Sequence, residues 1–284
     1  MRRQAILVLA MFLVFFAIHS ARAGFSSFPI CTATGGQYNP DISGNIVVWA
    51  DRRTGTDDIY GYDLSTNQEF AICTNSSSQG SAAISNDIVV WSDNRNGSDI
   101  YGYNLSTQTE FPICTASGSQ EAPAIYNNIV VWSDSRSFGS NIYGYNLSTS
   151  QEFAICTEND CQGTPAIYGD IVVWEDQRNG LNSDIYGYNL STQTEFPICT
   201  ASGNQFRSAI YGDIVVWTDG RNGNYDIYGY DLSTSQEFEV CIEGGVQGAP
   251  DVYEDLIIWG DRRNGLDDIY GYNLNLSKKI CGSQ

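Results

Sequence analysis

One segment of about 42 residues recurs six times along the sequence. The stretch VVWSDNRNGSDIYGYNLSTQTEFPICT begins at Val89 and returns with small changes in the other copies. The conserved spacing of the tryptophans gives the period, with separations of 42, 41, 42, 43 and 42 residues between Trp49, Trp91, Trp132, Trp174, Trp217 and Trp259. A period in this range with strand-like content is typical of one blade of a β-propeller.

Each copy contains four segments that favour strands. In the fourth copy, PAIY (Pro165 to Tyr168) is followed by a tight turn at Gly169-Asp170 and by IVVW, and then IYGYNL and FPICT follow after polar turns. The successive apolar residues of IVVW indicate a strand buried on both faces, as in a blade packed between two others. We therefore predict an all-β chain, a six-bladed β-propeller of four-stranded blades. An open β-solenoid is the alternative.

The first 23 residues have the pattern of a secretory signal peptide. Arg2 and Arg3 precede a long apolar run, and Ala21-Arg22-Ala23 has the form of a cleavage site. We expect residues 1–23 to be removed and residues 24–284 to form a single propeller domain that is secreted or displayed on the extracellular surface. No second apolar run reaches the ~20 residues that span a bilayer, so we expect no membrane insertion.

Composition argues against several classes of function. The net charge is −19, and it becomes more negative without the three arginines of the signal peptide, so nucleic acid and anionic lipid would be repelled. The single histidine, His19, lies in the signal peptide. The mature chain therefore lacks a Ser-His-Asp triad, a Cys-His pair and histidine ligands for zinc or copper, and we expect it not to be an enzyme.

The pattern W-x-D-x-R-N-G-x-x-D-I-Y-x-Y-x-L resembles the TolB-type propeller repeat. It is more similar still to the version found in surface proteins of methanogenic archaea and some bacteria. The resemblance covers all six copies, roughly Gln37 to Cys281. It implies a secreted or surface-displayed propeller used for interaction, and it implies neither an enzymatic activity nor one particular ligand.

Acidic residues and an arginine recur in the hairpin that follows each tryptophan. In the fourth copy they are Asp176, Arg178 and Asp184. We predict that the arginine is held between the two carboxylates and that the three residues are structural, because a catalytic set is not needed six times. Calcium binding by the same hairpins is the alternative, although the arginine already supplies positive charge.

A glycine lies between two tyrosines in the third strand of each copy, as in Tyr186-Gly187-Tyr188. Glycine in a strand leaves a hollow that a large neighbouring ring can fill, and we expect the tryptophan of the adjacent strand to fill it. Stacking of bases or sugars on the tyrosines is the alternative, but positions between blades are not accessible.

Seven of the eight cysteines recur with the repeat, namely Cys31, Cys73, Cys114, Cys156, Cys199, Cys241 and Cys281. Cysteines one blade apart are too distant for a disulfide, so we expect most of them to be buried thiols. Two pairs are exceptions: Cys31 with Cys281, and Cys156 with the additional Cys161.

The chain ends contain one outer strand too many. Seven segments have the outer-strand pattern, from FPICT at Phe28 to KKICG at Lys278, but there are only six copies of IYGY. We expect Phe28 to Thr32 to pair beside Lys279 to Cys281 on the sixth blade, with a Cys31–Cys281 disulfide. The alternative is that FPICT completes the sixth blade of another molecule and generates a fibre.

Six glycosylation sequons are present, at Asn75, Asn96, Asn104, Asn146, Asn189 and Asn275. Asn and Ser are also ordinary turn residues, so both interpretations are open.

A binding face is expected where loops converge and the copies differ. In each copy a glutamine lies where the chain reaches this face: Gln37, Gln79, Gln120, Gln162, Gln205 and Gln247. These amides are candidates to bind a sugar or peptide, or they cap strand ends. The next residue varies, and Tyr38, Glu121 and Phe206 are the bulky members, with Tyr38 and Phe206 as candidate stacking platforms.

Four residues after the glutamine, the first and last copies have Asp41 and Asp251 where the other four have alanine. Ring closure would make these two blades neighbours and bring the carboxylates together. They are a candidate calcium site, an acid/base pair, or two separate acids in channel water.

Three functions remain. The first is a non-enzymatic propeller that recognises a carbohydrate or surface protein. The second is a structural subunit of a surface layer or fibre, a homo-polymer, which the uniform blades favour. The third, a hydrolase or lyase, is disfavoured by the missing histidine.

Overall fold

The computed structural model describes residues 28–158 and 160–275. The chain divides into two units, Met1–Thr32 and Ala33–Gln284, and every strand described lies in the second. The predicted signal peptide and the outer strand expected at Lys279 to Cys281 lie outside the described residues. No described helix is long and apolar enough to cross a membrane.

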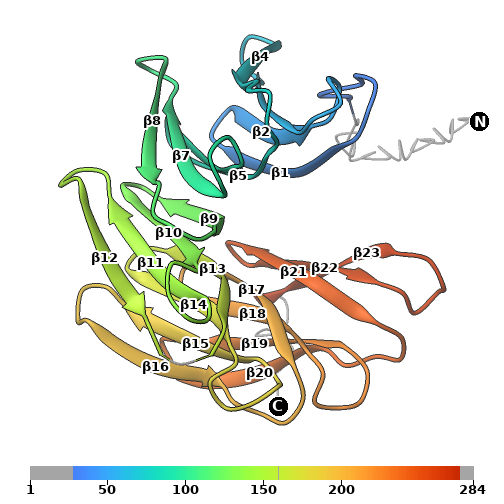
Figure 1. Ribbon diagram of the computed structural model, residues 1–284. Coiled ribbons are helices and arrows are strands. Elements are labelled where there is room, and N and C mark those ends of the chain that lie inside the picture. Colours follow the sequence, from blue (N-terminus) through green and yellow to red (C-terminus); the bar gives the residue numbers. More distant parts are fainter. Residues whose placement is uncertain (1–27, 159, 276–284) are drawn as a thin grey trace, which may run out of the picture. The chain divides into compact units, whose positions relative to one another are not determined.

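The regular secondary structure of the described chain is almost entirely β-strand, and the strands form six consecutive antiparallel sheets (Figure 1). The first strands are β1 (Gln37–Ser43), β5 (Gln79–Ser85), β9 (Gln120–Tyr126), β13 (Gln162–Tyr168), β17 (Gln205–Tyr211) and β21 (Gln247–Tyr253). The second strands are β2 (Ile46–Asp51), β6 (Ile88–Asp93), β10 (Ile129–Asp134), β14 (Ile171–Asp176), β18 (Ile214–Asp219) and β22 (Leu256–Asp261). The third strands are β3 (Asp58–Asp63), β7 (Asp99–Asn104), β11 (Asn141–Asn146), β15 (Asp184–Asn189), β19 (Asp226–Asp231) and β23 (Asp268–Asn273). The fourth strands are β4 (Gln68–Cys73), β8 (Thr109–Cys114), β12 (Gln151–Cys156), β16 (Thr194–Cys199) and β20 (Gln236–Cys241).

Successive blades contact one another through their first strands, from β1 against β5 to β17 against β21. Each sheet has the order first, second, third, fourth, as in β13-β14-β15-β16. The prediction of a six-bladed β-propeller with four-stranded blades is confirmed, and the sixth blade has three strands among the described residues.

The apolar core lies between the blades. Val172 packs with Val131 and Ile142 of the third blade, whereas Val173, its neighbour in β14, packs with Trp217 of the fifth blade. Both valines are fully buried, because alternate residues of a strand point to opposite faces and each face meets another blade. This arrangement explains why the second strands are continuously apolar.

The sixth blade differs from the others on one face. Ile269 of β23 is 77 % exposed, whereas its equivalents are fully buried: Ile59, Ile100, Ile142, Ile185 and Ile227. Leu256 and Ile258 of β22 are also exposed. The apolar pattern of the repeat therefore continues into this blade, but among the described residues nothing buries this face.

Candidate functional site

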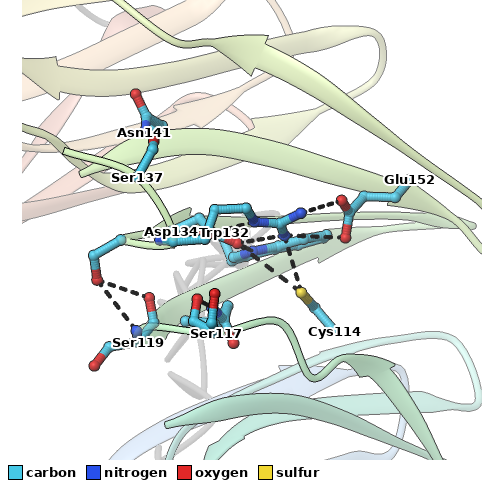
Figure 2. Close-up of polar contacts among 11 residues, drawn as sticks. Cys114, Ser117, Ser119, Trp132, Asp134, Ser137, Asn141 and Glu152 are labelled. Atoms are coloured by element: carbon cyan, nitrogen blue, oxygen red, sulfur yellow. Dashed lines mark hydrogen bonds and ion pairs between the residues drawn. The ribbon is translucent and has the colours of Figure 1, made fainter. Parts of the chain in front are cut away.

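In the second to sixth blades, the arginine of the hairpin forms a compact cluster that joins two blades. In the third blade, Arg136 donates through Nε and Nη2 to the two carboxylate oxygens of Asp134, at 2.9 and 2.6 Å. Nη2 also lies 3.1 Å from Glu152 Oε2 and 3.1 Å from the Sγ of Cys114, which belongs to the second blade. Figure 2 shows Asp134, Glu152 and Cys114 converging on this position. Trp132 Nε1 donates to Asp134 at 2.8 Å, so the buried carboxylate is saturated with donors.

The second carboxylate on the arginine is not the one predicted. Arg178 pairs with Asp176, as expected, but its other partner is Glu195 of β16 rather than Asp184. Asp184 instead accepts a hydrogen bond of 2.8 Å from Asn179. The prediction was wrong because it considered only the hairpin, whereas the fourth strand brings its glutamate across β15. The glutamates that pair in this way are Glu69, Glu110, Glu152, Glu195 and Glu237.

These contacts lower the pKa of several of the buried aspartates. For Asp261, the hydrogen bonds from Arg263 are the main cause, and they outweigh the opposing effect of burial. For Asp93, burial acts to raise the pKa, but hydrogen bonds from Arg95 and Trp91 together lower it below the ordinary value. The carboxylates are therefore held ionised between blades, which is a structural role.

The hollow above the strand glycine is filled by a phenylalanine of the fourth strand. Gly187 lies opposite Phe196, and a Cβ on Gly187 would be 2.8 Å from the Phe196 ring. The expectation that the tryptophan fills this space was wrong: Trp174 stacks on Tyr186, with ring centroids 6.5 Å apart. Arg178 lies over the ring of Tyr186, 4.2 Å from its centroid.

Five of the repeated cysteines are buried thiols that accept a hydrogen bond from the arginine of the next blade, namely Cys73, Cys114, Cys156, Cys199 and Cys241. Burial raises the pKa to about 12 for Cys73, Cys114, Cys156 and Cys199. Cys156 and Cys161 are not joined by a disulfide. The predicted Cys31–Cys281 bond involves Cys281, which lies outside the described residues.

Five of the six predicted glutamines are buried, namely Gln79, Gln120, Gln162, Gln205 and Gln247. The backbone N–H of Gln120 donates to the carbonyl of Ser98, in the blade before it, at 2.7 Å. Their position favours the alternative that they cap strand ends, since a buried amide offers no surface to a ligand. Gln37 is half-buried, and its amide donates to the nearby carbonyl of Gly35.

The variable residues that follow the glutamines are accessible. Glu121 is exposed, and Tyr38 is half-buried with its hydroxyl 3.3 Å from Arg52 Nη2. Arg52 in turn pairs with Asp57. Phe206 is half-buried and makes an edge-to-face contact with Tyr225, with centroids 5.1 Å apart.

Phe206 and Tyr225 form one wall of a pocket of about 450 Å³ between the fifth and sixth blades. Arg207 of β17 and Gly248 of β21 also line it, and Arg262 and Asp267 close it from the last hairpin. Arg262 and Asp267 form an exposed ion pair with each other. Sequence comparison of the blades identified Phe206, but it missed Tyr225, which occurs in a hairpin of variable length.

The charge of Asp251 acts on Asp41. Burial is the main cause of the raised pKa of Asp41, the backbone N–H groups of Ile84 and Ile42 oppose it, and the charge of Asp251 adds to it. Asp251 accepts the N–H of Val252 at 2.8 Å. Among the described residues, no group of three or more metal-ligating side chains is present. Calcium binding here stays a prediction.

A row of four tyrosines whose neighbouring rings contact one another at tilted angles was not predicted from the sequence. Tyr126, Tyr168, Tyr211 and Tyr253 end the first strands of four successive blades, with neighbouring centroids 4.7, 4.6 and 4.8 Å apart. The first two blades have Ser43 and Ser85 at this position. That difference between copies is visible in the sequence, but it lies at the opposite end of the first strands from the predicted binding face.

The sequons lie at turns. Asn104, Asn146 and Asn189 are half-buried, and each side-chain oxygen accepts a backbone N–H two or three residues later. These bonds fit the turn interpretation. Asn96 and Asn275 are exposed, and Asn75 is half-buried.

Comparison with known proteins rests on the fold. Neither a protein-family description nor a curated protein matches the chain by sequence. TolB from Acinetobacter baumannii has a TM-score of 0.61 at 16% identity, over 78% of this chain and 58% of that one. The chain shares the TolB propeller fold.

Two other structures extend this result. A prolyl endopeptidase has a TM-score of 0.67 at 10% identity, over 84% of this chain and 41% of that one. A chain of a nidogen/laminin complex has a TM-score of 0.53 at 13% identity, over 72% of this chain and 78% of that one. At these identities the likeness shows the fold alone, and the chain spans about half the length of the TolB and endopeptidase chains.

Proposed function

We propose that the protein is a secreted or surface-displayed, non-enzymatic propeller that binds a carbohydrate or protein partner on the face where the first strands begin. The pocket between the fifth and sixth blades carries this proposal, because it combines accessible aromatic side chains with a position at which the copies differ. The nidogen/laminin likeness is consistent with a binding role for the fold.

A glycan array together with a screen of surface proteins tests this function. We expect wild-type protein to bind a defined partner, and Phe206→Ala to weaken that binding without a change in melting temperature. Loss of folding in Phe206→Ala would be recognised by circular dichroism, and Tyr225→Phe then serves as the milder variant. Binding that is unchanged in both variants would exclude the pocket.

The alternative is a structural subunit that assembles by self-association or strand exchange. The exposed apolar face of the sixth blade favours it, since Leu256, Ile258 and Ile269 would be buried by a second copy. Light scattering after size-exclusion chromatography separates the two proposals. A large polymer without glycan or protein ligands would favour the structural role.

Calcium is proposed only for Asp41 and Asp251. A calcium-dependent rise in melting temperature in the wild type that is absent in Asp41→Asn would support it, because a ligand specific for the folded state stabilises that state. An equal response in both proteins would remove it.

A further inference from the structure

The pocket between the fifth and sixth blades contains Arg207, which differs from the other described arginines in its ion pairs. Eight arginines pair with carboxylates: Arg52, Arg53, Arg95, Arg136, Arg178, Arg221, Arg262 and Arg263. Arg207 is exposed, and within residues 28–158 and 160–275 its side chain forms no ion pair. Because acidic residues far outnumber basic ones, an arginine without a carboxylate is unexpected by composition.

Among the described residues, Glu175 is the carboxylate that contacts Arg207, and it binds the backbone rather than the side chain. Glu175 Oε1 accepts the N–H of Arg207 at 2.7 Å. This bond holds the backbone at Arg207, where β17 has a β-bulge and φ is +54°, and it leaves the five N–H donors of the guanidinium available. A planar guanidinium binds a carboxylate through two parallel hydrogen bonds.

An apolar wall lies next to this cation. The edge-to-face pair of Phe206 and Tyr225 offers a ring face and a hydroxyl, and Tyr225 is 38% exposed. The apolar C–H face of a pyranose ring packs on such a surface, while its hydroxyls face polar groups. A flexible acidic peptide needs no such wall.

Two glycines leave the space for a ligand. Gly248 follows the buried glutamine, and Gly260 of β22 lies beside it, with 3.5 Å between a Cβ built on Gly260 and the Gly248 carbonyl. The other blades have a side chain where Gly260 stands: Ala50, Ser92, Ser133, Glu175 and Thr218. A larger residue is therefore compatible with the fold at this position.

The charge of the pocket limits the ligand further. Arg262 and Asp267 neutralise each other, so Arg207 is the lining cation that remains unpaired. A polyanion would be repelled by the strongly acidic protein as a whole. A molecule that is neutral apart from one carboxylate can pair with Arg207 and is repelled less by the protein than a polyanion is.

We propose that this pocket binds a saccharide with a single carboxylate, such as a terminal glucuronate, with the carboxylate on Arg207 and the sugar ring on Phe206. The proposal rests on the proposed function and names the class of ligand for the same site.

A matched pair of ligands tests it. Calorimetry compares an oligosaccharide that ends in glucuronate with the same oligosaccharide ending in glucose. We expect the glucuronate form to bind at least about tenfold more tightly, since hydrogen bonds between charged groups are the stronger ones. Arg207→Gln should remove that difference, and added salt should weaken only the acidic ligand.

Two variants serve as controls. Arg52→Gln removes the same charge from a similarly exposed loop of the first blade and should leave binding unchanged. Thr218→Glu copies Glu175 of the fourth blade at a residue that lines the pocket and contacts Ala249 of the sixth blade, so it places a carboxylate there and should weaken the glucuronate ligand more than the glucose ligand.

The outcomes separate the two proposals. Equal binding of both ligands, unaffected by Arg207→Gln, would overturn the acidic class and leave a carbohydrate-binding propeller. No binding of either ligand, with binding of a surface protein in the partner screen, would overturn the saccharide and leave the general function. No partner of any kind would overturn both.

Discussion

The ring of Phe196 lies directly against Gly187, so that the fourth strand of the blade packs into a space that the third strand leaves open. The same pair occurs in five blades, as Gly61 with Phe70, Gly102 with Phe111, Gly144 with Phe153, Gly187 with Phe196 and Gly229 with Phe238. The glycine is therefore required by close packing rather than by an unusual backbone angle.

Gly187→Ala should destabilise the fold by ~1–3 kcal/mol, the usual cost of extra volume in a packed core. A Cβ at this position would be 2.8 Å from the ring. Gly80→Ala is the control, because nothing lies within 4 Å of a Cβ there. Urea unfolding measures both, and equal stability of the two variants would contradict the packing argument.

Arg178→Gln should lower stability by at least ~1–3 kcal/mol, because hydrogen bonds to charged groups on the buried Asp176 and on Glu195 are lost together. Arg52→Gln should change stability by less than ~0.5 kcal/mol, since its pair with Asp57 is exposed. Thermal unfolding compares the two. If Arg178→Gln kept full stability and lost a binding partner instead, the structural role would be refuted.

Acid should weaken the protein through the aspartates that bind arginine. The pKa of Asp93 and of Asp261 is lower in the folded than in the unfolded chain. Their contribution to stability is therefore complete above the unfolded value of about 4 and is lost as the pH falls through the folded value. Asp99 acts in the opposite sense, because burial raises its pKa and makes its ionised form unfavourable.

Unfolding free energies measured between neutral pH and pH 3 test the predicted direction of this change in stability. We expect a decrease below about pH 4. Asp99→Asn should stabilise the protein at neutral pH, and this gain should shrink on acidification. The third blade has Asn141 at the same place, bonded to Ser137, so the substitution fits the fold. A loss of stability at neutral pH would contradict the prediction.

The local pattern of apolar and polar residues was sufficient to predict the fold. Contacts between strands that are distant in the sequence could not be predicted from that pattern. The run of Val172 and Val173 predicted a strand buried on both faces, since adjacent residues of a strand face opposite ways. The partner of Arg178 depends on how β16 crosses the blade, and nothing near Arg178 in the sequence encodes that. Phe206 was found because the copies differ there, but its contact with Tyr225 depends on a hairpin whose length varies.

The spacing of the repeat predicts a position for the surplus outer strand. In five blades a fourth-strand cysteine contacts the arginine 22 residues later, as Cys73 does with Arg95. Cys31 precedes Arg53 by the same separation. In the described structure Phe28 to Thr32 forms no strand and Phe28 is 63% exposed. By the repeat register, we still expect this segment to become the fourth strand of the blade that comes before the first, which in a closed ring is the sixth.

The C-terminal candidate fits that position less well. Counted back from Cys281, Lys278 takes the place of the phenylalanine that covers the glycine, and an ammonium group cannot fill an apolar hollow. Phe28 takes the same place when the count starts from Cys31. We therefore expect Phe28 to pack against Gly271 of β23, where a Cβ has no neighbour closer than 3.4 Å in the described structure.

A double-mutant cycle tests this placement. Gly271→Ala should cost about as much as Gly187→Ala in the wild type and little in a Phe28→Ala background, because the clash requires the ring. A Cys31–Cys281 disulfide would add up to ~4–5 kcal/mol to the stability by closing most of the chain into one loop.

Coupling in a monomer, with the disulfide found within one chain by non-reducing peptide mapping, means that the strand closes its own ring. Coupling that appears only in a polymer, with the same disulfide between chains, means that the strand is exchanged between molecules, which is the fibre. Equal costs of Gly271→Ala in both backgrounds would exclude Phe28 from the sixth blade altogether.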